Sequence, residues 1–359
     1  MLMGGKGVRR GCCLALLSLA GLVNAGQGSE LAARQGIPYP AVIAHRGASF
    51  DAPESTAPAY VLARELGADY LELDLQRTRD GVLVAVHDDD LLRTSDVAQR
   101  FPERQGSPVS AFTLAELKSL DAGSWFNQAY PERARERFKG LQILTLDEVM
   151  DIAQGNAQRR PGLYIETKVP SLFPGIEADL KAKLQARGWL DKPGRVVLQS
   201  FDRSSLALLH QHMPQVPKIL LLWVGKGGMA SASGQTFAES GETDKAAFYA
   251  RQQPRSNAEF ERWLDYARAA GAIGTGPSAA RTAGGAQSYA DLVQPWMNRM
   301  SHDKGLLVHV YTVDEAVDFD KVMAAGVDGI FTNRSGQLLR YYSRSPALGE
   351  AQILEANGY

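Results

Sequence analysis

After residue 40 the sequence alternates between short apolar runs and longer amphipathic segments. Each apolar run predicts a buried strand, and the runs cover residues 41–45, 69–75, 162–167, 195–200, 218–223, 271–276, 306–311 and 327–331. The segments between them predict helices, the clearest of which are 175–187, 203–212, 259–270, 291–302 and 315–325. Eight parallel strands with intervening helices, over roughly 310 residues, predict an α/β fold of the TIM (β/α)8 barrel type.

Two segments depart from this alternation. Residues 78–81 form a turn that is too short for a parallel crossover, so residues 82–86 are expected to return antiparallel to barrel strand 2. Residues from about 88 to 144 lack barrel-like alternation, so we expect an inserted lobe there, with a helix at 114–120. The charged run at 132–139 interleaves acids and bases, which predicts a solvated helix face; contact with a membrane surface is the less favoured alternative.

Capping residues mark two of the helices. Residues 53–56 open a helix that is expected to run to about Leu66, and Gly67 ends it. Thr145 is expected to cap a helix at 146–153. These caps place one helix after the first strand and another directly after the inserted lobe.

The first 25 residues predict a signal peptide, with a retained membrane anchor as the alternative. Three cations precede an apolar run of about a dozen residues, short of the roughly 20 that a membrane span needs, and Ala25 fits the small-residue rule before a cleavage point. Cleavage would remove both cysteines and leave a periplasmic or secreted chain. Residues 26–38 are then a polar lead-in, 39–345 the barrel domain and 346–359 a C-terminal tail.

The charge of the chain argues against a nucleic-acid partner. The formal net charge is -1, and without the three cations of the first 25 residues, which contain no acid, it becomes about -4. A mildly acidic protein has no electrostatic attraction to phosphate backbones. We expect no stable membrane insertion either, and the partner should be a small molecule.

Ionisable side chains gather where TIM-barrel enzymes place catalytic groups, at the carboxyl ends of the predicted strands. Glu72 and Asp74 alternate with leucines, so both carboxylates lie on one face of their strand, and Glu166 and His45 end neighbouring strands. The antiparallel return brings His87 beside them. Any single carboxylate could be a salt-bridge partner, but three without a cysteine favour one hard divalent ion, Ca²⁺ or Mg²⁺, over zinc.

An ordered series of short motifs resembles one enzyme family. The motifs are AHRG at 44–47, PEST at 53–56, ELD at 72–74, VHD at 86–88, IETK at 165–168, LQSF at 198–201, YTV at 311–313 and GVDGIFTN at 326–333. The series resembles the bacterial, exported type of the glycerophosphodiester phosphodiesterase family, over almost the whole chain after residue 40. The resemblance implies metal-dependent hydrolysis of glycerophosphodiesters to an alcohol and sn-glycerol 3-phosphate.

The resemblance also implies roles for the ionisable residues. Glu72, Asp74 and Glu166 match the metal ligands of the family. His45 and His87 match an acid and base pair, with the glycerol hydroxyl of the substrate attacking phosphorus before water opens the cyclic phosphate. The sequence leaves open which histidine is the acid and which is the base.

Four further residues are expected to bind the substrate. Arg46 can form a bidentate fork on phosphate oxygens, and Lys168 is a second cation on the same strand face as the third carboxylate. Gln199 matches a polar family position. Tyr311 stands where many family members carry tryptophan, so the resemblance implies an aromatic wall there; ordinary barrel packing is the alternative.

The remaining histidines and two aromatic residues of the lobe are expected to be mainly structural. The histidines are His210 and His212 at a helix end, His302 in a loop, and His309 packed inside the barrel. Trp125 and Phe126 either line the substrate mouth or hold the lobe down.

Two other functions are alternatives to a glycerophosphodiester phosphodiesterase. A related barrel phosphodiesterase, sphingomyelinase D-like or phosphoinositide-specific, would act on intact or lyso-phospholipid and present an apolar rim to the bilayer. The candidate loops, 225–243 and 88–110, are instead polar or rich in small residues. A non-catalytic barrel that binds headgroups would be favoured by the loss of a histidine or a carboxylate, and none is missing.

Overall fold

The chain closes into a barrel of eight parallel strands in a computed structural model, which describes residues 26–156, 158–223, 237–244, 247–248, 251, 254, 256–279, 292–344 and 346–359. The strands are β1 (Ala41–Ala44), β2 (Tyr70–Arg77), β4 (Gly162–Thr167), β5 (Val196–Ser200), β6 (Lys218–Leu222), β7 (Gly274–Pro277), β8 (Leu307–Val310) and β9 (Gly329–Thr332). Strand β1 pairs with both β9 and β2, which closes the barrel. The predicted TIM barrel is confirmed.

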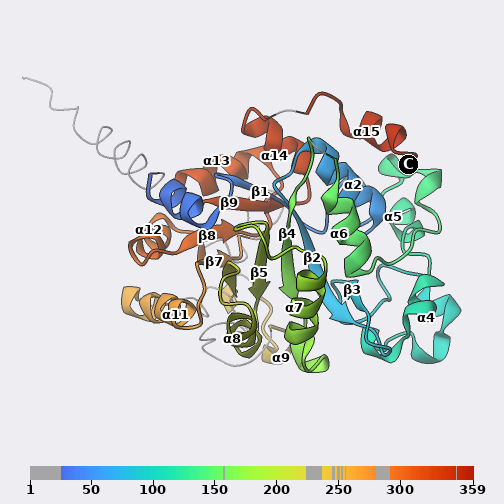
Figure 1. The fold of residues 1–359 in the computed structure, drawn as a ribbon, viewed down its shortest axis with the longest axis horizontal. Coiled ribbons are helices and arrows are strands. Elements are labelled where there is room, and N and C mark those ends of the chain that lie inside the picture. The colour runs from blue at the N-terminus through green and yellow to red at the C-terminus, as the bar shows by residue number, and fades with distance from the viewer. Residues whose placement is uncertain are drawn as a thin grey trace, which may run out of the picture.

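Helices pack around the outside of the strands (Figure 1). They are α2 (Ala57–Leu66), α6 (Leu146–Gln154), α7 (Ile176–Ala186), α8 (Arg203–His212), α9 (Phe237–Ser240), α11 (Asn257–Ala269), α12 (Pro295–Asp303), α13 (Ala316–Ala324) and α14 (Ser335–Tyr341). Thr145 forms the expected cap, as a capping box with Glu148, and Gly67 ends α2 in the left-handed conformation, whereas Thr56 precedes α2 without a side-chain capping hydrogen bond. Helix α12 begins later than expected, at Pro295, where proline has no helical hydrogen bond to lose.

Apolar side chains fill the barrel beneath its carboxyl end. The inward-facing positions recur at every second residue, and the buried cluster that they form includes Ala41, Ile43, Tyr70, Tyr164, Val197, Ile219, Leu307 and Phe331. The His309 ring is fully buried among them, and its Nδ1 lies 2.9 Å from the Tyr164 hydroxyl. The prediction of a packed histidine is therefore confirmed. Burial of each large side chain in this layer stabilises the fold by roughly 1.5–3 kcal/mol. The layer fills the barrel interior below the site.

His302 differs from the prediction. It lies in the last turn of α12 rather than in a loop, and it is buried. Its Nε2 is 2.8 Å from Asp328 Oδ2, and the same carboxylate oxygen accepts a hydrogen bond from the backbone N–H of Val308. This buried pair ties a helix end to β8.

The antiparallel return strand and the inserted lobe follow β2. Strand β3 (Leu83–Ala85) pairs antiparallel with β2, as expected. The lobe contains α3 (Val97–Arg100), α4 (Leu114–Lys118) and α5 (Ser124–Ala129), joined by short 3₁₀ turns. Phe126 packs edge-on against Phe138 with ring centroids 5.7 Å apart, so it holds the lobe down rather than lining a substrate mouth. The Trp125 ring is partly buried against this lobe core and lies under Arg93.

The charged run of the lobe is largely exposed, as predicted, but it does not form a single helix face. Residues 131–133 and 136–138 form two 3₁₀ turns. The guanidinium of Arg133 lies 3.9 Å from the Phe50 ring centroid and 4.1 Å from that of Tyr130. Arg133 is therefore held against aromatic rings and is only partly exposed.

Both ends of the described chain pack on the barrel. Residues 26–35 are helical, and Ala32 is fully buried. The expected C-terminal tail contains α15 (Glu350–Ala356), which packs against α2, and Arg135 donates a hydrogen bond to the Tyr359 carbonyl oxygen at 3.1 Å (Figure 1). The predicted signal peptide and most of the 225–243 loop lie outside the described residues. Within the described ranges, no helix combines the length and hydropathy needed to cross a membrane.

Candidate active site

A cavity of about 640 Å³ opens at the carboxyl end of the barrel. All nine residues predicted from the sequence line it: His45, Arg46, Glu72, Asp74, His87, Glu166, Lys168, Gln199 and Tyr311. Residues that the sequence did not single out complete the lining: Phe201, Leu221, Trp223, Ser278, Thr312 and Phe331. The barrel therefore brings together side chains that are more than 260 residues apart.

The strand register places the acidic residues side by side. Asp74 on β2 pairs with Glu166 on β4, which in turn pairs with Gln199 on β5. Residues in register on adjacent parallel strands point to the same face, here the barrel interior. Glu72, Asp74 and Glu166 are buried, and a ligand atom from each lies within 4.8 Å of the others. This carboxylate trio has the spacing of a metal site.

The two nearby cations do not fully neutralise the carboxylate trio. Arg46 Nε lies 3.4 Å from Asp74 Oδ2, and Lys168 Nζ lies 3.2 Å from Glu166 Oε1. Burial and the charge of Asp74 raise the pKa of Glu72, and burial also raises the pKa of Glu166. Burial acts the same way on Asp74, but His87, Lys168 and Arg46 together hold its pKa below the usual range. When all three carboxylates are ionised, the two cations leave one negative charge without a counter-charge.

A divalent cation fits this arrangement. Buried oxygens without a hydrogen-bond partner include Asp74 Oδ2 and Gln199 Oε1. Gln199 Nε2 reaches toward Glu72 Oε1 at 3.4 Å, which places its amide next to the trio. An all-oxygen ligand set suits Ca²⁺ or Mg²⁺, because both prefer hard oxygen donors.

Hydrogen bonds fix the tautomer of His45. Its Nδ1 lies 2.8 Å from Asn333 Oδ1, and Asn333 Nδ2 donates to Asp314 Oδ2 at 2.7 Å. Because the amide nitrogen must face the Asp314 carboxylate, the amide oxygen faces the ring, so Nδ1 carries the proton. Burial, with Arg46 adjacent, lowers the pKa of His45 to about 3. The ring is therefore neutral at physiological pH and holds a lone pair on Nε2.

His87 has an anionic partner instead. Its Nδ1 lies 2.6 Å from Asp88 Oδ1, and Arg93 Nε donates to the other oxygen of that carboxylate at 2.6 Å. Although burial raises the pKa of Asp88, the hydrogen bonds from His87 and Arg93 hold it below its usual range. An ionised carboxylate only accepts hydrogen bonds, so the Nδ1–H of His87 donates to it and the ring is oriented by an anion. The two histidines thus differ in the charge of the group that orients them.

Sequence reasoning missed the residues that orient the histidines. Asn333 and Asp88 end two of the quoted motifs, GVDGIFTN and VHD, so their position beside a site residue was available as a clue. Glu54, in PEST, bridges Arg46 and Arg93 at 3.0 and 2.7 Å. Asp314 had no comparable clue, because its role depends on contact with Asn333 across two strand ends.

The remaining wall of the cavity is apolar and mostly aromatic. The Tyr311 ring packs edge-on against Phe201, with centroids 5.7 Å apart, and its hydroxyl donates to the Leu222 carbonyl oxygen at 3.0 Å. Trp223 and Phe331 extend this wall. The cavity therefore has a charged half, at the carboxylate trio, and an apolar half that can contact an uncharged or quaternary-ammonium group.

Replacing Asn333 by alanine is expected to lower kcat about 10- to 100-fold with little change in KM. The His45 ring would lose the partner that fixes its tautomer, and orienting partners of this kind are worth about that much. The matched control is Ser49→Ala, because the Ser49 hydroxyl hydrogen-bonds Asn333 Oδ1 and the backbone carbonyl oxygen of His45, whereas the partner of the imidazole Nδ1 is Asn333. Steady-state kinetics of the two variants test this, and equal effects of both would contradict it.

The comparisons with known proteins agree on one family. Residues 45–337 match the model of the glycerophosphoryl diester phosphodiesterase family. A glycerophosphodiester phosphodiesterase of Bacillus subtilis (strain 168) is 37% identical over 294 residues, covering 81% of this chain and 82% of that protein.

Two solved structures share the fold. A glycerophosphodiester phosphodiesterase from Agrobacterium tumefaciens has a TM-score of 0.55 at 24% identity, over 82% of this chain and 96% of that one. An Oleispira antarctica phosphodiesterase, solved in complex with the product sn-glycerol-3-phosphate, has a TM-score of 0.60 at 22% identity, over 85% of this chain and 97% of that one.

Proposed function

The chain belongs to the glycerophosphoryl diester phosphodiesterase family, and we propose that it hydrolyses glycerophosphodiesters to an alcohol and sn-glycerol 3-phosphate with a divalent cation. One observation carries the proposal. A single cavity is lined by the buried carboxylate trio and by two histidines, one with a neutral amide partner and the other with a carboxylate partner. The names of the matched relatives support it, and they do not favour an enzyme of intact phospholipid or a silent headgroup-binding barrel.

The charged half of the cavity binds the phosphodiester. Glu72, Asp74 and Glu166 would hold the cation, which would neutralise charge on the phosphate oxygens during the reaction. The guanidinium of Arg46 and the ammonium of Lys168 line the same half of the cavity and attract the phosphate. The aromatic wall around Tyr311 is left for the alcohol part of the substrate.

His45 acts as the general base in the first step. Its Nδ1–H is held by Asn333, so the free lone pair on Nε2 can take the proton from the glycerol hydroxyl adjacent to the phosphate. That hydroxyl oxygen then bonds to phosphorus. The bond from phosphorus to the alcohol oxygen breaks, which leaves a cyclic glycerophosphate.

His87 acts as the general acid in the same step. It donates its Nε2 proton to the oxygen of the departing alcohol, while Asp88 holds the ring in place through Nδ1. In the second step the roles reverse. His87 takes a proton from water, which attacks phosphorus, and His45 returns its proton to the glycerol oxygen as the ring opens.

Activity of the purified mature protein tests the proposal. Glycerophosphocholine, glycerophosphoethanolamine and a lysophospholipid are each assayed with EDTA and again after Ca²⁺ or Mg²⁺ is restored. We expect metal-dependent turnover of the two glycerophosphodiesters with release of glycerol 3-phosphate. Turnover of the lysophospholipid alone would favour the intact-lipid enzyme, and binding without turnover of all three would favour the silent barrel.

We also propose that the protein is exported and cleaved, so that its mature form begins near Gly26. The cations, short apolar run and Ala25 of the first 25 residues motivate this proposal. N-terminal sequencing of protein from the periplasm or medium is expected to read from about Gly26. Finding Met1 on protein from that fraction would contradict cleavage.

A further inference from the structure

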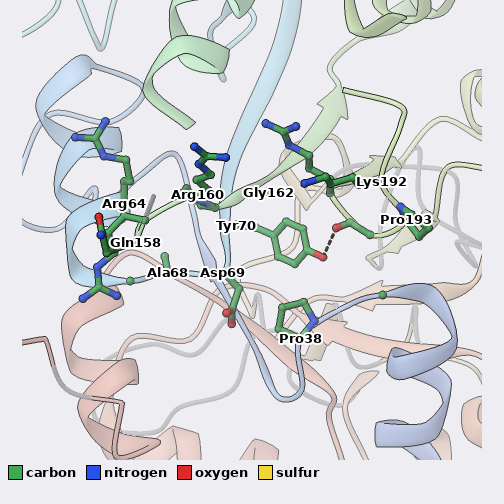
Figure 2. Close-up of a pocket in the computed structure, with 16 residues that line it drawn as sticks. Pro38, Arg64, Ala68, Asp69, Tyr70, Gln158, Arg160, Gly162, Lys192 and Pro193 are labelled. Atoms are coloured by element: carbon green, nitrogen blue, oxygen red, sulfur yellow. Dashed lines mark hydrogen bonds between the residues drawn. The ribbon is translucent and has the colours of Figure 1, made fainter. Parts of the chain in front are cut away.

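A second cavity, of about 360 Å³, is drawn in Figure 2, and its lining residues place it at the opposite end of the barrel from the candidate active site. Its walls are the amino ends of β2, β4 and β5 and the loops that precede them, including residues 67–70, 158–162 and 192–195. The lead-in contributes Gly36 and Pro38. None of its lining residues is shared with the active-site cavity, so this is a separate site.

Cations dominate the lining of the second cavity. The basic side chains are Arg64, Arg159, Arg160, Lys192 and Arg195, whereas Asp69 is the one acid. The Asp69 carboxylate already forms an ion pair with Arg344, at 2.6 Å, and so does not neutralise the cavity cations. Arg64 is paired with Glu65 at 2.7 Å. The cavity therefore has a positive excess.

The other four cations have no carboxylate partner within 4.0 Å in the part of the chain that the structure describes. Arg195 lies over the Trp189 ring, with its guanidinium carbon 3.8 Å from the centroid. A stacked guanidinium keeps its in-plane N–H donors available for an anion. Arg160 Nε donates to the Asn156 carbonyl oxygen at 3.0 Å, and the two terminal nitrogens of the guanidinium can then donate to an anion.

The cations of this cavity repel one another. Burial, together with the nearby charge of Arg160, lowers the pKa of Arg195, although Asp191 opposes the effect. Like charges held close together without counterions cost free energy, which an anion between them would recover. Most other arginines of the lobe and barrel, such as Arg77 and Arg93, have direct carboxylate partners. What sets this cavity apart is that four cations without a carboxylate partner in the described chain line one hollow.

The floor of the cavity is rigid. Tyr70 is 1% exposed, and its hydroxyl donates to the Gly194 carbonyl oxygen at 2.6 Å, which ties β2 to the 192–195 loop (Figure 2). Gly162 lies against the same ring, where a Cβ would approach to 2.5 Å. A fixed floor, with Arg195 stacked on Trp189 and Arg160 held on Asn156, lowers the ordering cost of binding.

We propose that this basic cavity binds a small phosphorylated anion, through Arg160, Arg195 and Lys192. Guanidinium and ammonium donors match phosphate oxygens in charge and geometry, and the volume suits a phosphate or a small phosphomonoester. The shared chemistry is the phosphate dianion, free or carried on an alcohol. The site does not depend on the proposed catalytic function, because it shares no residue with that cavity.

Equilibrium dialysis with inorganic phosphate tests the site on the full mature protein. The wild type is expected to bind one more molar equivalent than the double variant Arg160→Gln/Lys192→Gln, whose residual affinity should fall at least about tenfold. Both residues are exposed, so the variant should fold. The matched control, Arg262→Gln/Arg268→Gln, removes two exposed cations of α11 that line neither cavity.

The control is expected to bind as the wild type does, and all three proteins should turn over glycerophosphocholine at the same rate. Repeating the dialysis with sn-glycerol 3-phosphate separates the two sources of the anion. Equal losses with both probes assign the cavity to phosphate itself, and a loss with glycerol 3-phosphate alone assigns it to a phosphorylated alcohol. If the double variant binds both probes with wild-type stoichiometry and affinity, the proposal is wrong.

Discussion

Replacing Glu72 by glutamine is expected to lower activity more than about 100-fold and, at the same time, to raise the melting temperature of the metal-free protein. The variant loses one oxygen ligand of the carboxylate trio, and weaker perturbations of metal sites already cost up to about that factor. It also removes one of three buried like charges, whose repulsion destabilises the folded chain when no cation balances it. Calcium or magnesium should then stabilise the wild type but not the variant.

The pH dependence of this stability has a definite sign. In the metal-free protein the folded-state pKa of Glu72 is raised, chiefly by burial and Asp74. Above that raised pKa the buried carboxylate is ionised and lowers the free energy of unfolding. As the pH falls through it toward the ordinary carboxyl value, the folded protein takes up the proton first, so stability rises. Glu72→Gln should abolish this rise.

Melting curves in EDTA and in metal, from neutral pH downward, measure both effects. The exposed Glu355→Gln is the matched control, because it makes the same chemical change away from the cavity. This control should keep the activity of the wild type, the rise in melting temperature on adding metal, and the dependence of the melting temperature on pH. The equivalent Asp74→Asn and Glu166→Gln variants should behave as Glu72→Gln does. If any of the three keeps full activity and normal metal affinity, the carboxylate trio is not the metal site.

Alanine at His45 or at His87 is expected to reduce the rate by about 10² to 10⁴, and the leaving group should tell the two apart. With a glycerophosphodiester of 4-nitrophenol, the departing phenolate needs no proton. His87→Ala should therefore recover most of its rate in single-turnover release of the phenol, because it lacks only the acid. His45→Ala should lose as much on this substrate as on glycerophosphocholine, because the hydroxyl still has to be deprotonated.

The opposite pattern would reverse the two roles. Unchanged activity in both variants would overturn acid and base catalysis by this pair. The double variant should lose less than the product of the single losses, because the two groups act in one step.

A substrate that lacks the glycerol hydroxyl next to the phosphate tests the cyclic route. It should still bind through Arg46 and Lys168 but should not turn over, so that the loss appears in kcat. Rapid turnover of this deoxy substrate would instead favour direct attack by water on the diester.

Local patterns were sufficient for the barrel and for most of the site. Period-two alternation placed Glu72 and Asp74 on one strand face, and strand ends placed His45 and Glu166 at the same edge, because the carboxyl ends of parallel strands share one side of a barrel. Cap residues such as Thr145 predicted helix starts, since a capping box depends on neighbours within three positions. The charged run at 132–139 is exposed as predicted but is not helical, and its periodicity carries no information on the aromatic rings that Arg133 contacts.

Contacts between residues that are distant in the sequence determine the remaining features, namely the hydrogen-bond partners of the histidines and the basic cavity. Asn333 meets His45 across 288 positions because β9 pairs with β1 when the barrel closes, and that contact fixes which ring nitrogen carries the proton. Asp314 matters only because it turns the Asn333 amide. The basic cavity likewise forms where three loops converge beneath β2, β4 and β5. Side-chain types and strand periodicity are local and can be predicted from the sequence, whereas hydrogen-bond partners and charge balance depend on closure of the barrel.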